Sequence, residues 1–179
     1  MSIPDEQSLV ARAKRGDREA LGALWNALTP RIFGYLINTM RDRTLAEDIL
    51  QATWLKAITA LPRFEKRGIG ISAWLFVIAR NECREHWRRS GRITSLDPTK
   101  HDSADGDGET IKEKILAEQI LASLPESDRE ILRLRYIADL SLNELAQVLE
   151  LNFVTVRVRI HRALARARTT LTSITPKTP

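Results

Sequence analysis

The sequence has little of the chemistry on which enzymes and disulfide-bonded proteins depend, with one cysteine and three histidines in 179 residues. The lone cysteine, Cys83, excludes an internal disulfide and the zinc sites that are built from several cysteines. The scattered histidines form no convergent catalytic set, which argues against a hydrolase or a metal enzyme. We therefore expect a protein that is not an enzyme and uses no cofactor, no metal ion and no small-molecule substrate.

Long apolar runs are also missing from the sequence. No 18 apolar residues stand together, so we expect no membrane insertion. The N-terminus lacks a charged start followed by an apolar core, the pattern of a secretory signal. We predict a soluble, cytoplasmic protein.

Acidic residues are absent from the end of the chain. Residues 151–179 carry six basic residues and no acidic one, whereas the whole chain has 28 basic and 23 acidic residues. Such a basic end is typical of nucleic-acid binding, of binding to an anionic membrane, or of a merely solvated tail. The affinity of an RNA-binding or membrane-surface protein would depend on charge alone. Added salt would then abolish binding whatever the sequence of the nucleic acid.

Strand-like alternation is scarce, and apolar residues recur at helical spacing along most of the chain. Three pairs match the capping box that starts a helix, and breaks are expected at Gly and Pro positions that include Thr29-Pro30. The pattern predicts an all-α fold. The capping pairs are Thr44 with Glu47, Ser127 with Glu130, and Ser141 with Glu144.

The stretch SLDPTKHDSADGDGET, residues 95–110, has five acidic residues and a single leucine as its only large apolar residue. It cannot bury a core, so we expect a flexible acidic linker at 93–111. The linker would join two small helical domains, residues 1–92 and residues 112–179.

The stretch SLNELAQVLELNFVTVRVRIHRALARAR, residues 141–168, has the layout of a helix-turn-helix, with a turn at 150–152 and Asn152 as the cap of a longer second helix. On that helix Val156 and Ile160 share a packing face, while Arg159 falls on another face. A helix with one apolar and one arginine stripe fits the major groove, where arginine reads guanine edges and binds phosphates. The alternative is an ordinary amphipathic helix with solvated arginines.

The stretch SAWLFVIARNECREHWRRSGR, residues 72–92, interleaves aromatic rings with arginines. Rings that stack on unpaired bases and guanidinium groups that neutralise phosphates suit single-stranded nucleic acid. The loop FEKRGIGIS, residues 64–72, precedes it and would supply backbone groups to a base pocket. The alternative is that Trp74 and Phe76 belong to the core.

Three stretches of the chain together resemble the extracytoplasmic-function (group IV) sigma factors of the sigma-70 family. The stretches are AEDILQATWLKAI (46–58), AWLFVIARNECREHWRR (73–89) and the segment from Leu124 to Arg168. They come in family order, at family spacing, around the acidic linker. The resemblance implies a sigma factor that binds core RNA polymerase and directs promoter-specific initiation in bacteria. It implies a region 2 like domain at 1–92, a region 4 like domain at 112–179, and an anti-sigma factor as a further partner.

The resemblance also assigns residues to three surfaces, here given only as implications. The core-polymerase surface would comprise Glu47, Asp48, Gln51 and Leu55. The surface for melted minus-ten DNA would comprise Phe64, Lys66, Arg67, Trp74, Arg80, Asn81, Arg84, Arg88 and Arg89. The surface for minus-35 duplex DNA would comprise Asn152, Thr155, Arg157, Arg159, His161, Arg162 and Arg166.

Departures from the family pattern fall at the helix-turn-helix. Glu150 stands where many members have the glycine of the turn, Val154 where a small residue is common, and Val158 where serine is frequent. A second interpretation remains open, a stand-alone helix-turn-helix transcriptional regulator. Such a protein would carry a dimerisation helix or a ligand domain in its N-terminal half.

Overall fold

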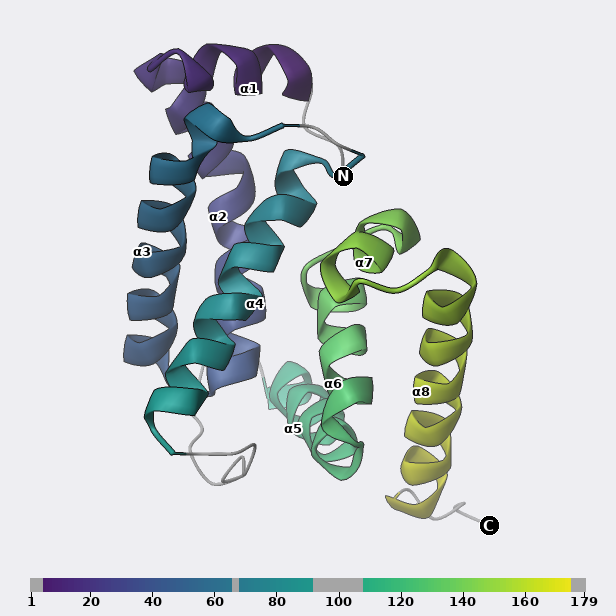
Figure 1. Ribbon diagram of the computed structural model, residues 1–179. Helices are drawn as coiled ribbons and strands as arrows, with labels where there is room; N and C mark the ends of the chain where they lie inside the picture. Colours follow the sequence, from purple (N-terminus) through teal and green to yellow (C-terminus); the bar gives the residue numbers. More distant parts are fainter. Residues whose placement is uncertain (1–4, 66–67, 92–107, 175–179) are drawn as a thin grey trace.

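The computed structural model describes residues 5–65, 68–91 and 108–174, and within these ranges the chain forms helices and no strand. In the N-terminal half, α2, α3 and α4 run side by side and α1 lies across one end of them (Figure 1). This packing gives each long helix one buried face. The elements are α1 (Glu6–Lys14), α2 (Arg18–Met40), α3 (Arg43–Ala60), a short 3₁₀ helix η1 (Leu61–Arg63) and α4 (Ile71–Arg89).

The C-terminal half is a second group of helices that ends in a helix-turn-helix formed by α7 and α8 (Figure 1). The predicted all-α fold with a helix-turn-helix at its C-terminal end is confirmed. The elements are α5 (Gly108–Ser123), α6 (Glu126–Leu132), a π-helical turn η2 (Arg133–Ile137), α7 (Leu142–Leu149) and α8 (Phe153–Ile174). Because α5 begins at Gly108, its first turn falls inside the predicted linker; residues 92–107 lie outside the described ranges.

The break predicted at Thr29-Pro30 is wrong, because α2 continues through Pro30. Proline inside a helix removes one backbone hydrogen bond and costs about 3 kcal/mol. Leu28 and Ile32, on either side of it, are both 0% exposed. Burial of this face against the other helices therefore outweighs the local preference of proline.

Only one of the three predicted capping boxes forms as predicted. Ser141 and Glu144 exchange both hydrogen bonds at the start of α7. Asp42, and not Thr44, caps α3, since its carboxylate accepts from the Leu45 N–H at 3.0 Å. The third pair does not form because α6 begins one residue before Ser127, after the N-cap Pro125.

The two halves share one continuous apolar core. In the N-terminal half the rings of Tyr35 and Phe76 meet edge to face at 5.8 Å, and both residues are buried. Leu134 and Leu140 are fully buried in the C-terminal half. α4 contacts α7, and α2 contacts η2, so the C-terminal half covers part of the DNA-facing helix that the sequence predicts.

No helix in the described part of the chain is both long enough and apolar enough to span a bilayer.

Candidate nucleic-acid and protein interfaces

The turn between α7 and α8 is tight and depends on one unusual backbone conformation. Glu150 adopts φ 55°, in the left-handed region that favours glycine. The Leu151 N–H donates to the Ala146 carbonyl oxygen at 2.9 Å, which closes the end of α7. Asn152 then caps α8, as predicted, because its side-chain oxygen accepts from the Thr155 N–H at 2.7 Å. The turn thus keeps a glycine-like geometry although it contains Glu150.

α8 has one packing face and one broad exposed face. Val156, Ile160 and Ala163 are buried against the rest of the C-terminal half, as the spacing predicted. The arginines lie outside this face, at solvent-exposed positions. The exposed residues include Arg157, Arg159, His161, Arg162, Arg166 and Arg168.

Two of the residues predicted to meet duplex DNA also have partners within the chain. Arg166 donates from Nη1 to the Asp128 carboxylate on α6, which ties α8 to α6. Asn152 uses its side-chain oxygen as the helix cap. The side chains most available to bind DNA are therefore those of Arg157, Arg159 and the neighbouring exposed residues.

On α4, the predicted minus-ten residues do not all share one environment. Asn81 and Arg84 are exposed. Arg88 and Arg89 are exposed and both pair with Glu85, whose pKa is lowered mainly by its hydrogen bond with Arg88. Exposed pairs of this kind contribute little to stability, so exchanging Glu85 for a phosphate would cost little.

The assignment of Phe64 to the DNA surface needs correction, because Phe64 is 6% exposed and belongs to the core. Its ring packs against the half-buried ring of Trp74 with centroids 4.8 Å apart. An apolar ring beside a second ring gains more from this packing than from solvent exposure. Lys66 and Arg67 lie outside the described residues.

The loop before α4 is held by α1, which sequence reasoning did not single out. Lys14 donates from Nζ to the Phe64 carbonyl oxygen at 2.6 Å. Glu6 accepts from the Ile71 N–H at 3.4 Å, at a helix start where Gly70 has no side chain to act as a cap. No local signal marks these contacts, since their partners are 50 and 65 residues apart in the sequence.

Arg80, predicted to hold the DNA backbone, is instead buried between the two halves. Its Nε donates to Glu130 Oε1 at 2.5 Å and its Nη2 to Glu130 Oε2 at 3.2 Å. Burial opposes the charge of Arg80, yet the hydrogen bond and charge of Glu130 raise its pKa. In this arrangement Arg80 is engaged within the protein and is closed to DNA.

Further polar contacts join the same two halves. Arg31 on α2 donates from Nη2 to the carbonyl oxygens of Ala138 and Asp139, at 2.8 and 2.9 Å. Gln147 on α7 donates from its amide to the Gly68 carbonyl oxygen in the loop before α4. These contacts keep α7 against α4 and the loop, while the outward side of α8 stays open.

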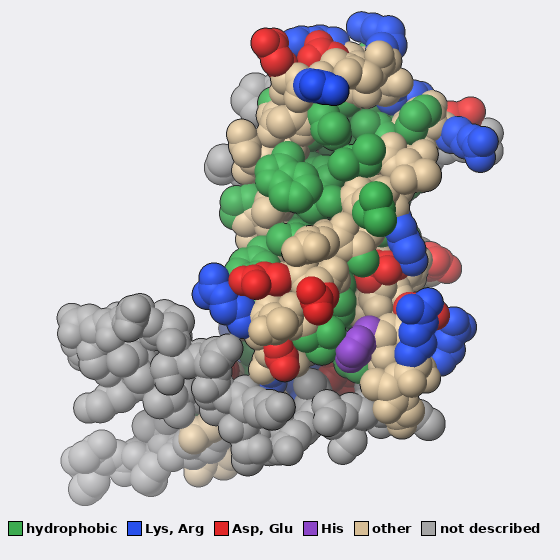
Figure 2. Space-filling model, turned by 90° about the vertical axis from the view of Figure 1, so that its left-hand side faces the viewer, with side chains coloured by type: hydrophobic (Ala, Val, Ile, Leu, Met, Phe, Trp, Pro, Cys, Tyr) green, Lys and Arg blue, Asp and Glu red, His purple; other side chains and the backbone are tan. Residues whose placement is uncertain are grey.

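The predicted core-polymerase residues line one exposed side of α3. Asp48, Gln51 and Leu55 follow one another at helical spacing, and Leu55 is 70% exposed. Glu47 is exposed beside them and pairs with Arg43 at 2.9 Å. Figure 2 shows a broad apolar area on this side of the molecule, with acidic side chains gathered below it.

The apolar area continues beyond the predicted residues. Ile58 is 42% exposed and Trp25, on α2, is 38% exposed. The Trp25 ring packs against the buried Trp54 ring with centroids 4.7 Å apart. The sequence could have indicated that Ile58 belongs to this area, because it stands three residues after Leu55. It could not have indicated Trp25, because Trp25 has the spacing of an ordinary core residue. We call Trp25, Leu55 and Ile58 the α2/α3 patch.

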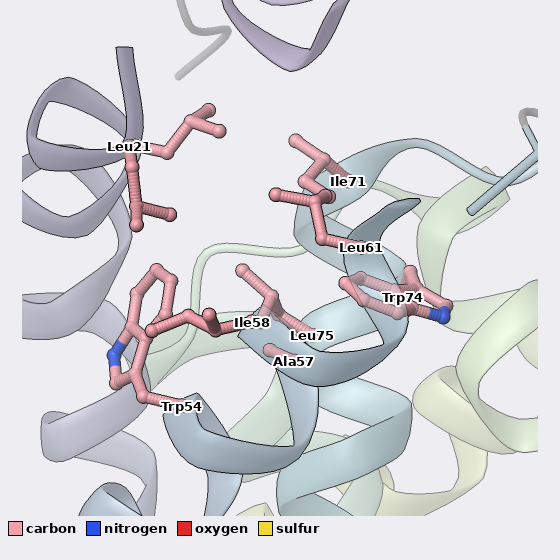
Figure 3. A pocket seen from close by; sticks show the side chains of 9 residues that line it. Leu21, Trp54, Ala57, Ile58, Leu61, Ile71, Trp74 and Leu75 are labelled. Atoms are coloured by element: carbon pink, nitrogen blue, oxygen red, sulfur yellow. The ribbon is translucent and has the colours of Figure 1, made fainter. Parts of the chain in front are cut away.

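An apolar hollow adjoins this patch where α2, α3 and α4 come together. The side chains of Leu21 and Trp54 lie on one side of it, and those of Leu61 and Ile71 lie on the other (Figure 3). No charged side chain lines it. The hollow is small and apolar, and it offers no group that would act on a substrate.

Cys83 lies on α4, one turn after Arg80, and is 1% exposed. Burial raises its pKa to about 12, so its thiol stays protonated at neutral pH. A protonated, buried thiol is a poor nucleophile and a poor metal ligand.

Comparison with known proteins identifies the family. Residues 24–93 match the family model described as Sigma-70 region 2, and residues 115–166 match Sigma-70, region 4. The chain is 32% identical over 173 residues to the RNA polymerase sigma-H factor of Pseudomonas aeruginosa, covering 88% of this chain and 89% of the relative. It is 27% identical over 169 residues to the ECF RNA polymerase sigma factor BldN of Streptomyces coelicolor, covering 88% of this chain and 64% of that relative.

A solved structure agrees with these matches. The chain resembles CnrH in complex with the cytosolic domain of CnrY, with a TM-score of 0.74, 25% sequence identity, and coverage of 95% of this chain and 99% of that chain. The chain therefore belongs to the sigma-70 family of DNA-binding transcription factors. Within that family it belongs to the extracytoplasmic-function sigma factors, the promoter-specificity subunits of bacterial RNA polymerase. The chain is 33% identical over 172 residues to the ECF RNA polymerase sigma factor SigD of Mycobacterium tuberculosis, covering 90% of this chain and 81% of that relative.

Proposed function

We propose that the chain divides this work among three surfaces. The acidic and apolar side of α3, from Asp48 to Leu55, binds core polymerase. The exposed side of α4 with Asn81 and Arg84 binds the melted minus-ten strand, and α8 binds the minus-35 duplex. The supporting observation is that these surfaces stand on separate helices that expose the residue types each task needs.

The domain limits belong to this proposal. Residues 1–92 act as the region 2 like domain and residues 112–179 as the region 4 like domain, with 93–111 as the link between them. Linking two weak DNA-binding units raises the effective concentration of the second once the first is engaged. The chain performs no chemistry of its own; polymerase makes RNA in the cytoplasm, and the chain directs where it starts.

The contact between the two halves has to open for this function. Arg80 is held by Glu130, and Gln147 on α7 binds the loop that would receive the minus-ten base. Because α7 occupies that surface, binding of the melted strand requires α7 to move away from α4. The described arrangement thus represents a state of the protein before promoter opening.

An anti-sigma factor is the further partner that we propose. CnrH, which shares the fold and 25% sequence identity, was solved in complex with the cytosolic domain of CnrY. A protein partner that covers the α2/α3 patch would exclude polymerase from it, since both need the same apolar side chains.

A direct test combines the full chain, core polymerase and a promoter fragment. The three together should form a complex that retains the fragment, whereas neither protein retains it alone at the same salt concentration. Retention of the fragment by the chain alone, with no effect of polymerase, would contradict the proposal.

One observation favours a second function, that of a stand-alone duplex-binding regulator. α8 is open to solvent in the described arrangement while α4 is partly covered, so duplex binding needs no movement of the domains. The same mixing experiment decides between the two, because a stand-alone regulator gains nothing from polymerase.

A further inference from the structure

We propose that Val154 and Val158 determine sequence preference by contacting thymine methyl groups on the floor of the major groove. This inference rests on the proposed role of α8 in minus-35 binding. It concerns two positions that the family resemblance left without a role.

The two valines lie at the outermost part of α8. At about 100° per residue, Val154 and Val158 fall on the side opposite the buried Val156 and Ile160. Val154 is 69% exposed and Val158 is 42% exposed. Both follow shortly after Asn152, which caps the helix, and the first residues of a recognition helix are the ones that reach base edges.

Cationic residues flank the valines on both sides of the helix. Going around α8, Arg157 falls on one side of the valines, and Arg162 falls on the other. Both are exposed, and residues 151–179 contain no acidic residue. The arrangement matches a groove about 12 Å wide, which has phosphates along both walls and bases along its floor.

This charge pattern identifies the occupant as duplex DNA. An apolar partner protein would match the valines but would leave cationic groups on both sides without anions. Duplex DNA satisfies both requirements at once, because the phosphates take the flanking charges and the groove floor carries the thymine methyl groups.

The chemistry of valine determines which base group it can recognise on the floor of the major groove. Its side chain has neither a donor nor an acceptor, so it makes no hydrogen bond to a base edge. The group it matches is the C5-methyl of thymine, which cytosine and uracil lack. Burying one such methyl is expected to change affinity by about fourfold.

The test starts from a random-sequence duplex pool selected with the full chain and core polymerase. The selected duplexes are then remade with deoxyuridine in place of single thymines, which removes only the methyl group. Wild-type protein should lose about fourfold in affinity at one or two positions of the upstream element. Val154→Ala or Val158→Ala should bind the thymine duplex with the same loss and show no further loss with deoxyuridine.

Leu171→Ala is the matched control, because Leu171 is 38% exposed on α8 and lies about 20 Å along the helix from Val158. It should keep the full sensitivity to the methyl group. Helicity measured by circular dichroism should be unchanged in all three variants, since alanine favours the helix and the replaced side chains are exposed.

The outcomes separate this inference from the proposed function. Equal binding of thymine and deoxyuridine duplexes by wild type, or full methyl sensitivity in both valine variants, overturns the role of the valines while the selected element stands. An upstream element made only of G·C pairs overturns it as well. Failure to select any shared element overturns the minus-35 role of α8 and the inference with it.

Discussion

Arg80 on α4 and Glu130 on α6 form a two-bond ion pair across the two halves of the chain, with Nε to Oε1 at 2.5 Å and Nη2 to Oε2 at 3.2 Å. The two side chains are 11% and 24% exposed. The same Arg80 belongs to the predicted minus-ten surface. In our proposal, Glu130 and a DNA phosphate compete for this guanidinium group, and that competition would link domain opening to strand binding.

Glu130→Gln should favour separation of the two halves, because it removes the charge that holds the buried Arg80. Loss of one partner of a buried pair costs about 3–5 kcal/mol, and partial exposure lowers that figure here. Cys83 is the only cysteine in the sequence and lies one turn from Arg80. Its alkylation rate in the native protein should rise at least tenfold.

The matched control is Glu19→Gln, whose side chain is 92% exposed in a loose pair with Arg12. Its Cys83 alkylation rate should equal that of wild type. Equal rates for Glu130→Gln and wild type would show that the ion pair does not hold the two halves together.

Alkaline pH should destabilise the fold through Cys83. Burial raises the pKa of this thiol from 9.0 to about 12, so between these values the folded chain keeps a proton that the unfolded chain releases. The free energy of unfolding should therefore fall as pH rises from about 9 to 12, by up to about 1.4 kcal/mol per pH unit from this group. Urea unfolding of wild type and Cys83→Ala across this range measures the effect.

The Cys83→Ala variant should show the shallower decline. Tyr35, whose pKa is raised mainly by burial and also by the charge of the nearby Cys83, is present in both proteins, so the part of its shift that burial causes cancels in the comparison. Identical slopes for both proteins would refute the assigned cause.

The α2/α3 patch should supply most of the affinity for core polymerase. Leu55→Asp places a charge at the 70% exposed centre of the patch and should weaken core binding more than tenfold, with little effect on folding. Lys56→Ala serves as the control, because Lys56 points toward α4 and pairs with Glu82. Fluorescence titration of core polymerase measures both. A stronger effect from Lys56→Ala would place the polymerase surface elsewhere.

Asn81→Ala should slow promoter opening and leave core binding intact, because Asn81 is exposed on α4 within the proposed minus-ten surface. Gln51→Ala, on α3, should weaken core binding first. Permanganate footprinting follows opening, and the titration above follows binding. Reversed effects of the two variants would mean that the roles of α3 and α4 have been exchanged.

Local patterns in the sequence predicted the parts of the structure that depend on near neighbours. Asn152 caps α8 and Ser141 caps α7 because each acts within three residues of its partner. The packing face of α8 follows from spacing alone. These features need no knowledge of the rest of the chain.

Features that depend on distant partners were not predictable in this way. Phe64 is an aromatic residue in a basic loop, and only its packing against Trp74 shows that it belongs to the core. Arg80 looks like its exposed neighbour Arg84 in the sequence, and Glu130 lies 50 residues away. Pro30 stays inside α2 because tertiary burial of that helix outweighs its local cost.

The most direct measurement of the central claim adds the purified full chain to core bacterial RNA polymerase with a genomic DNA library and sequences the transcript starts. The account predicts discrete starts that share two spaced upstream elements and that depend on both α4 and α8. DNA binding by the chain with no added initiation would contradict it.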